Sequence, residues 1–175
     1  GHACPVYPRY VSGTAPDNVW VYAGRDLGWG QLFRFDGRTW TVRDLSGEGA
    51  PNHVSSMFVD DESHGWLGEW GMVYEVNGDD LTVHPFDGHQ AIWALARTPD
   101  GVLHAAGGSQ YQTVYPNNWI ENEHSYGFMA RYDGARWTLE SSGADSPLAS
   151  FFVCPDRPSL IAAGGDGVIE QVSSD

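Results

Sequence analysis

The sequence predicts an all-β protein: a small β-propeller of about four blades, each a four-stranded antiparallel meander. Three observations support this. One hairpin signal recurs three times along the chain, and a second hairpin precedes each copy. The chain has 175 residues, 22 of them Gly, and a hydrophobic fraction of 41%. That length and composition suit one turn-rich globular domain over residues 1–175.

The recurring signal is an alternating strand, an Asp-Gly or Asn-Gly pair, two further residues and an apolar-Thr-apolar strand. Asp-Gly and Asn-Gly tolerate the positive φ angles of tight hairpins, so each copy predicts a β-hairpin. The spacing before the third copy is longer by about 15 residues, which indicates an insertion. The three copies are Phe33–Val42, Tyr74–Val83 and Ala130–Leu139.

A second predicted hairpin precedes each of these, and one more follows them. The two strands of each of these four hairpins are Tyr10–Ser12 with Val19–Ala23, Ser55–Val59 with Trp66–Trp70, Ala91–Arg97 with Val102–Ala106, and Ala149–Val153 with Ser159–Ala163. The blades would then span about residues 8–45, 53–86, 90–142 and 148–175.

The fourth unit has a third strand at Val168–Val172 and no fourth. Propellers avoid such open sheet edges. Three completions are open: an outer strand from the N-terminus at His2–Tyr7, a second chain forming a homodimer, or further blades of a longer propeller.

Two stretches resemble bacterial β-propeller repeat proteins with BNR-like, Kelch-like or regulator-propeller-type blades. They are Asp61–Gly71, with its Asp-x-x-x-Gly-Trp turn, and Ala15–Trp20 leading into Phe35–Trp40. The leading Ser-x-Asp of the sialidase Asp-box is not clearly present. The resemblance implies a propeller and says little about chemistry, because such folds serve many functions.

The charge balance excludes some partners. The 23 acidic residues outnumber nine basic ones, all Arg, which gives a net charge of −14. Binding to nucleic acid or to anionic membranes depends on basic clusters, so we expect neither. Cationic ligands, divalent ions and sugars remain compatible, and the charge can also serve solubility alone.

Three features of the sequence indicate where in or outside the cell the protein is found. No apolar run approaches the ~20 residues that span a bilayer, so we expect no membrane insertion. The opening Gly1-His2-Ala3-Cys4 is typical of a trimmed start. Cys4 and Cys154 form either a disulfide or two thiols. With the fold resemblance, these features predict an extracellular or periplasmic protein.

The predicted binding surface is the end of the blades where second strands lead into third strands, because long aromatic loops on a rigid scaffold usually carry binding. The insertion Ser109–Tyr126 lies there. Its aromatics would stack on a glycan or contact a protein, or else fold the insertion onto the blades. The candidate binding residues are Arg25, Asp26, Trp29, Trp70, Tyr111, Tyr115, Asn118, Trp119 and Tyr126. The repeat-related Trp20, Trp40, Trp66 and Trp137 are expected to pack between blades.

Metal binding has weaker support. His53, His89 and His124 would converge on a divalent cation in the central channel, although spaced histidines are usually solvated loop residues. The acidic turn Asp60–Glu62 lacks EF-hand spacing and is expected to cap a hairpin. No cofactor is therefore expected beyond such a cation.

No catalytic motif is present: no Gly-x-Ser-x-Gly elbow, no His-Glu-x-x-His and no phosphate-binding glycine loop. The sequence therefore predicts a non-catalytic module that binds a glycan or a protein. The alternative is a glycan-acting hydrolase or lyase with a carboxylate pair at the channel mouth, drawn from Asp26, Glu69 and Asp87.

Overall fold

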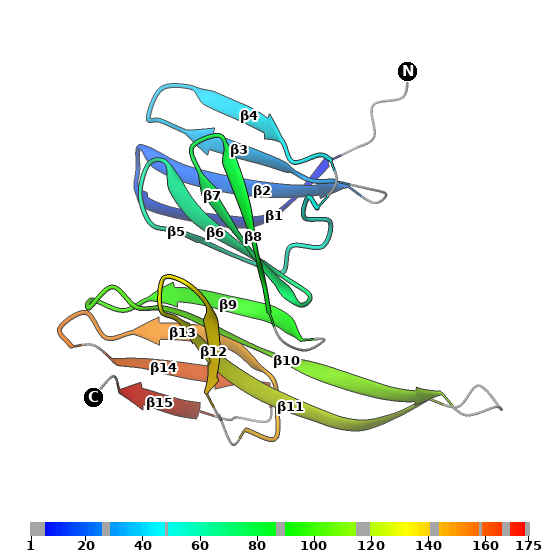
Figure 1. Cartoon of the computed structure of the whole chain (residues 1–175). Coiled ribbons are helices and arrows are strands. Elements are labelled where there is room, and N and C mark those ends of the chain that lie inside the picture. Colours follow the sequence, from blue (N-terminus) through cyan, green and yellow to red (C-terminus); the bar gives the residue numbers. More distant parts are fainter. Residues whose placement is uncertain are drawn as a thin grey trace. The chain divides into compact units, whose positions relative to one another are not determined.

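The computed structural model describes most of the chain as β-strands and turns. It contains no helix long and apolar enough to cross a membrane in the part described. The chain divides into two compact units, Gly1–Pro85 and Phe86–Asp175 (Figure 1). The described residues are 6–25, 29–47, 49–86, 90–114, 120–140, 144–157, 159–165 and 169–173, of which residues 6, 25, 109–114, 120–125 and 169–173 are described by their backbone alone.

The first unit contains two four-stranded sheets, and each strand pairs antiparallel with the next along the chain. This is the predicted meander of blades one and two. Blade one comprises β1 (Val6–Ala15), β2 (Asn18–Arg25), β3 (Gln31–Phe35) and β4 (Trp40–Asp44). Blade two comprises β5 (Ser56–Val59), β6 (His64–Glu69), β7 (Met72–Asn77) and β8 (Asp80–Pro85).

The second unit repeats the meander, with three strands described in its last sheet. Blade three comprises β9 (Ala91–Arg97), β10 (Leu103–Val114), β11 (Ile120–Tyr132) and β12 (Trp137–Glu140). Blade four comprises β13 (Leu148–Val153), β14 (Ser159–Gly164) and β15 (Ile169–Ser173).

The N-terminal strand belongs to blade one. Val6 pairs with Arg25 and Tyr7 with Gly24, so these two residues continue β1 along β2. The sequence analysis considered His2–Tyr7 as an outer strand of blade four, and this is wrong for Val6 and Tyr7. The reason is the register: β1 begins four residues before the predicted strand and uses this segment for pairing within its own sheet. The other residues of this segment, 2–5, lie outside the described residues.

The insertion in blade three is a β-ribbon where the sequence predicts a loop. β9 pairs with β10 only up to Gly108, whereas β10 and β11 remain paired out to Val114 and Ile120 (Figure 1). β12 likewise pairs with β11 only from Met129 onward. The backbone thus satisfies its hydrogen bonds by lengthening a hairpin.

The hairpin turns follow the predicted Asp-Gly chemistry. The Oδ1 atom of Asp36 accepts hydrogen bonds from the backbone N–H groups two and three residues later, at 2.8 and 2.7 Å. Asp133 does the same at 2.9 Å for both bonds. The glycines that follow have positive φ angles, 86° at Gly37 and 92° at Gly134. Repetition in the sequence therefore produces repetition in turn geometry.

The two sheets of the first unit pack face to face. Successive side chains of a strand point to opposite sides, so each sheet has two distinct faces. We call the side of a blade that contacts the next blade its forward face, and the opposite side its backward face. The forward face of blade one contributes Trp20, Tyr22 and Leu32; the backward face of blade two contributes Leu67, Tyr74 and Val76.

The second unit uses the same contact. The forward face of blade three packs against the backward face of blade four, with β9 and β10 beside β13. The residues are smaller, and the cluster consists of Ala94, Ala106 and Met129 against Leu148, Leu160 and Ala162. One kind of face-to-face contact therefore organises each unit.

The repeat-related tryptophans divide into two groups. Trp20 and Trp66 are buried, at 0% and 2% exposure, as expected for packing residues. Trp40 is 52% exposed and lies outside the contact between blades one and two, so its expected packing between blades is not found within the first unit. It lies on the backward face of blade one, where its ring meets Phe35 at a centroid distance of 5.0 Å. Trp137 is half-buried and stacks on Tyr132 at 5.2 Å.

Replacing Trp20 by Ala should lower the free energy of unfolding by about 3–5 kcal/mol, because the indole fills the contact between two blades. Urea denaturation monitored by circular dichroism measures this change. Trp29→Ala is the matched control, since Trp29 is 49% exposed and should change stability by less than about 1 kcal/mol. Equal losses in the two variants would contradict the assigned core.

Candidate functional site

Two exposed tryptophans lie at one end of the first unit. Trp29 directly precedes β3 and Trp70 occupies the turn between β6 and β7, so both lie where second strands lead into third strands. Their exposures are 49% and 50%, and Met72, which begins β7 two residues after Trp70, is 41% exposed. We call this set, Trp29, Trp70 and Met72, the aromatic end. Both tryptophans belong to the predicted binding residues.

A buried carboxylate fixes the turn that carries Trp70. Glu69, only 8% exposed, pairs with Met72 across this turn, and Gly71 supplies the required positive φ of 70°. The Glu69 carboxylate accepts hydrogen bonds from the backbone N–H groups of Asn52 at 3.3 Å and His53 at 2.9 Å. The turn is therefore tied to the segment that connects blade one to blade two.

The same carboxylate affects two buried phenols below it. Burial, reinforced by the negative charge of Glu69, raises the pKa of Tyr22 to about 12. Burial and Glu69 also raise the pKa of Tyr74. Both phenols therefore stay neutral at ordinary pH.

The backbone beside Trp29 is also held in place. The Gly30 carbonyl accepts a hydrogen bond from the Leu45 N–H at 3.0 Å. A Cβ at Gly30 would overlap the ring of Tyr22, so only glycine fits there. Both exposed tryptophans thus emerge from backbone that is anchored by buried neighbours.

The other predicted binding residues are partly described. Tyr126 is half-buried, and its hydroxyl accepts a hydrogen bond from Gln90 Nε2 at 3.1 Å. Arg25 ends β2 and Tyr111 lies in β10, both described by backbone alone. The remaining four, Asp26, Tyr115, Asn118 and Trp119, lie outside the described residues.

The predicted metal ligands are not brought together in the described part. His53 is exposed and uses its backbone N–H to bond Glu69. His124 is described by backbone alone, and His89 lies outside the described residues. Among the residues described, no group of three or more His, Cys, Asp or Glu side chains could hold a metal ion. Cys154 is buried, and its candidate partner Cys4 is also not described.

The sequence analysis named three carboxylates as candidates for a hydrolase or lyase site, and only Glu69 is among the described residues. Glu69 is buried and already accepts two backbone hydrogen bonds, which is a structural role. Asp26 and Asp87 lie outside the described residues. The described part of the first unit therefore offers Glu69 as an anchor for a loop rather than as a group open to substrate.

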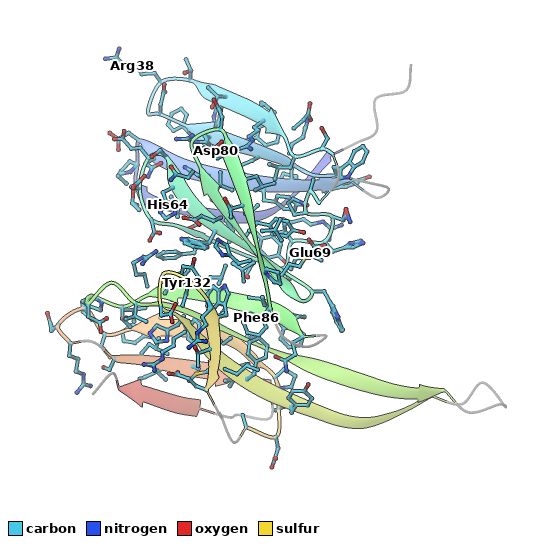
Figure 2. All side chains as sticks on the ribbon, viewed as in Figure 1. Arg38, His64, Glu69, Asp80, Phe86 and Tyr132 are labelled. Atoms are coloured by element: carbon cyan, nitrogen blue, oxygen red, sulfur yellow. The ribbon has the colours of Figure 1, made fainter. Side chains whose placement is uncertain are left out.

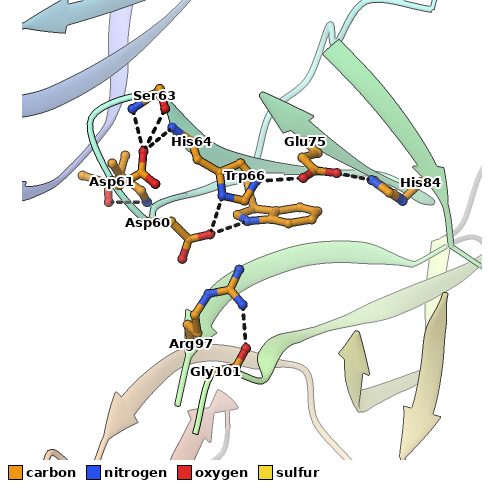
Figure 3. A network of polar contacts seen from close by, with 11 residues as sticks. Asp60, Asp61, Ser63, His64, Trp66, Glu75, His84, Arg97 and Gly101 are labelled. Carbon is orange, nitrogen blue, oxygen red and sulfur yellow. Dashed lines mark hydrogen bonds and ion pairs between the residues drawn. The ribbon is translucent and has the colours of Figure 1, made fainter. Parts of the chain in front are cut away.

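A line of alternating carboxylates and imidazoles crosses blade two and was missed by the sequence analysis (Figure 3). His64 Nδ1 lies 3.1 Å from Asp60 Oδ2, and His64 Nε2 lies 2.8 Å from Glu75 Oε1. The other oxygen of Glu75 lies 2.9 Å from His84 Nε2. Trp66 Nε1 donates to Asp60 at 2.8 Å. This His–carboxylate line joins strands β6, β7 and β8.

The hydrogen bonding in this line depends on protonation. An ionised carboxylate only accepts hydrogen bonds, so His64 donates from both nitrogens at once only when its ring is protonated. Burial alone would raise the pKa of Glu75. Hydrogen bonds from His84 and His64, together with their positive charge, outweigh burial and lower the pKa of Glu75 below its usual value of 4.5.

Sequence reasoning missed the line because its members are dispersed. His64 and Trp66 share one face of β6, and cross-strand pairing places Glu75 opposite Trp66. The alternation of polar residues on β6, β7 and β8 was the available signal, but it becomes a cluster only once the register is known. Figure 2 shows that His64 and Glu69 lie at opposite ends of β6, so this line is separate from the aromatic end.

A cleft of about 350 Å³ opens at the turn end of the first unit, opposite the aromatic end. Arg34 lies in it, with its guanidinium carbon 4.7 Å from the centroid of the buried Trp20 ring. The lining is mainly polar and acidic: Asp17, Asn18, Arg34, Phe35, Asp36, Thr41 and Glu62. The cleft has no counterpart among the sequence predictions.

Comparison with known proteins confirms the fold. No protein-family model and no curated protein matches the chain. The solved structure described as YCF48 bound to D1 peptide matches with a TM-score of 0.58 and 15% identity, over 96% of this chain and 49% of that one. The β-propeller domain of Cps50 (Swd1) from Myceliophteria thermophila matches with a TM-score of 0.43 and 12% identity, over 89% and 67%. The chain is thus a β-propeller protein that spans about half the length of the YCF48 structure.

Glu75→Gln should lower the free energy of unfolding at neutral pH by about 1–2 kcal/mol, because the line loses its central charge. Because the pKa of Glu75 is lower in the folded protein than in the unfolded chain, the ionised carboxylate stabilises the fold. This stabilisation is complete above pH 4.5 and is lost as the pH falls through the lower pKa of the folded protein. The variant should therefore show a shallower loss of stability on acidification, measured by urea denaturation at several pH values. Glu62→Gln, at an exposed carboxylate, is the control. An unchanged acid profile in Glu75→Gln would contradict the assignment.

Proposed function

We propose that the chain is a non-catalytic propeller module that binds a protein partner through the aromatic end. The observation that carries this proposal is the pair of half-exposed tryptophans, Trp29 and Trp70, on backbone held by buried groups. Trp is strongly enriched among the residues that dominate binding energy in protein interfaces. With Met72, Trp29 and Trp70 are large apolar side chains exposed at one end of the strands of the first unit, where water solvates them poorly.

The rigidity of the aromatic end supports binding. Association costs free energy when loops and side chains must be ordered. Glu69 already fixes the Trp70 turn, and Gly30 with Tyr22 fixes the backbone beside Trp29. A partner would therefore meet a preorganised surface and bear less of that cost.

Two observations favour a protein over a glycan. Met72 adds an aliphatic side chain to the surface, and methionine is frequent in adaptable protein interfaces. The similar YCF48 structure is described as bound to a peptide, which supports peptide recognition by a related fold. The net charge of −14 would speed association with basic segments. We infer a partner segment with apolar or aromatic side chains flanked by Arg or Lys.

Selection from a random peptide library on the immobilised chain tests the proposal. Peptides with basic and aromatic residues should be enriched and bind with dissociation constants near 1–100 µM. Trp29→Ala and Trp70→Ala should each weaken binding about tenfold or more with nearly unchanged melting temperature. Trp40→Ala is the matched control, because Trp40 is equally exposed but lies on the backward face of blade one.

Two results would overturn this proposal. One is an absence of enriched peptides; the other is equal binding by the wild type and the Trp29→Ala, Trp70→Ala double variant. A glycan array run in parallel identifies the remaining alternative. Glycan binding that the double variant loses, without peptide binding, would assign the aromatic end to carbohydrate.

A further inference from the structure

The backward face of blade one is apolar and uncovered within the first unit. Strand pairing places its side chains on one side of the sheet, and they are Val11, Val19, Val21, Phe33, Phe35, Trp40 and Val42. Val11 is 70% exposed, Trp40 52% and Val42 55%. A depression of about 220 Å³ lies between Trp40, Phe33, Val21, Ala23 and Pro8. A continuous apolar surface of this kind usually marks an interaction site.

Charge is almost absent from this face. Its only described ionisable side chain is that of Asp44, whose carboxylate accepts a hydrogen bond from Gln31 Nε2 at 2.6 Å. This contrasts with a net charge of −14 for the whole chain. The partner of this face is therefore expected to be apolar and uncharged.

The repeat identifies the kind of surface that covers such a face. Counted from the turn glycines Gly37 and Gly78, the backward-face residues Phe33, Phe35 and Trp40 of blade one correspond to Tyr74, Val76 and Leu81 of blade two. In blade two these residues pack on the forward face of blade one, and Tyr74 and Val76 are 2% and 1% exposed. The forward face of blade one thus buries two of these three equivalents, Tyr74 and Val76, and partly buries Leu81.

Blade four presents a forward face of matching character. Its backward face packs on blade three through Phe151, Leu160 and Ala162. The opposite side carries Phe152, which is 62% exposed, paired across the strands with Ile161. The other described side chains there, Ser150 and Ala163, are also uncharged.

We propose that a second copy of this chain covers the backward face of blade one with the forward face of its blade four. The contact would be of the type that already occurs once in each unit, between blades one and two and between blades three and four. The chain matches 49% of the YCF48 chain, so two copies supply about the length of that propeller. Two reciprocal contacts then form a symmetric dimer.

The charge of the chain gives the dimer a characteristic salt response. Two chains of −14 repel each other, while the contacting faces are uncharged. Salt screens the repulsion without weakening an apolar contact. Dimerisation should therefore strengthen as NaCl is raised, opposite to the response of an interface built on ion pairs.

Sedimentation equilibrium of the purified chain tests this proposal. The wild type should have twice the 19.2 kDa chain mass at about 100 µM in about 0.5 M NaCl. Val11→Asp and Phe152→Asp should each give monomers, because each places a charge in both contacts of the symmetric dimer. Thr41→Asp is the matched control: Thr41 is exposed on β4 and faces away from Val42, so this variant should still dimerise. Trp70→Ala should dimerise as well, which separates this test from that of peptide binding.

A mixture of the two disrupted variants identifies the surfaces. Val11→Asp retains an intact blade four and Phe152→Asp an intact blade one, so the mixture should form heterodimers through one restored contact. Restoration would also show that both variants are folded. A monomeric wild type under these conditions would overturn the proposal and leave the face to blade four of the same chain or to blades of a longer chain. Dimerisation of Phe152→Asp alone would overturn it too, because blade one would then pack on itself.

Discussion

The packing of a forward face on a backward face is the interaction on which the rest of this structure depends. In the first unit it buries Trp20 and Tyr22 against Tyr74 and Val76. This burial also supports the backbone of the aromatic end, since Tyr22 packs against Gly30 and Tyr74 lies next to Glu69. The aromatic end is thus built on the contact between two blades.

The same contact links the two proposals while keeping them separable. Among the described residues of the first unit, no blade packs on the backward face of blade one, and the turns at the ends of its strands are exposed. The apolar backward face of blade one follows from the first property and the aromatic end from the second. Trp40 and Trp70 are about equally exposed, at 52% and 50%, yet lie on surfaces with different geometry. Exposure alone therefore does not assign a role to either tryptophan.

Local chemistry made much of the fold predictable from the sequence. Asp36 with Gly37 and Asp133 with Gly134 specify hairpin turns that need no distant partner. The His–carboxylate line was not predictable, because the pairing of Glu75 with its neighbours depends on register between strands. The exposure of Trp40 was not predictable either, since its repeat position indicates packing and only the structure shows an uncovered face. Trp29 and Trp70 were predicted as binding residues, but the anchoring role of Glu69 was not.

Fluorine NMR of the chain labelled with 5-fluorotryptophan tests the central claim, that blade-to-blade packing supports exposed binding residues. Signals assigned by single Trp→Phe variants report the solvent exposure of each ring through their shift between H₂O and D₂O. The account predicts almost no solvent shift at Trp20 and large shifts at Trp29 and Trp70, in line with their exposures of 0%, 49% and 50%. A solvent shift at Trp20 as large as that at Trp29 would contradict it, because the contact between blades one and two would then be absent.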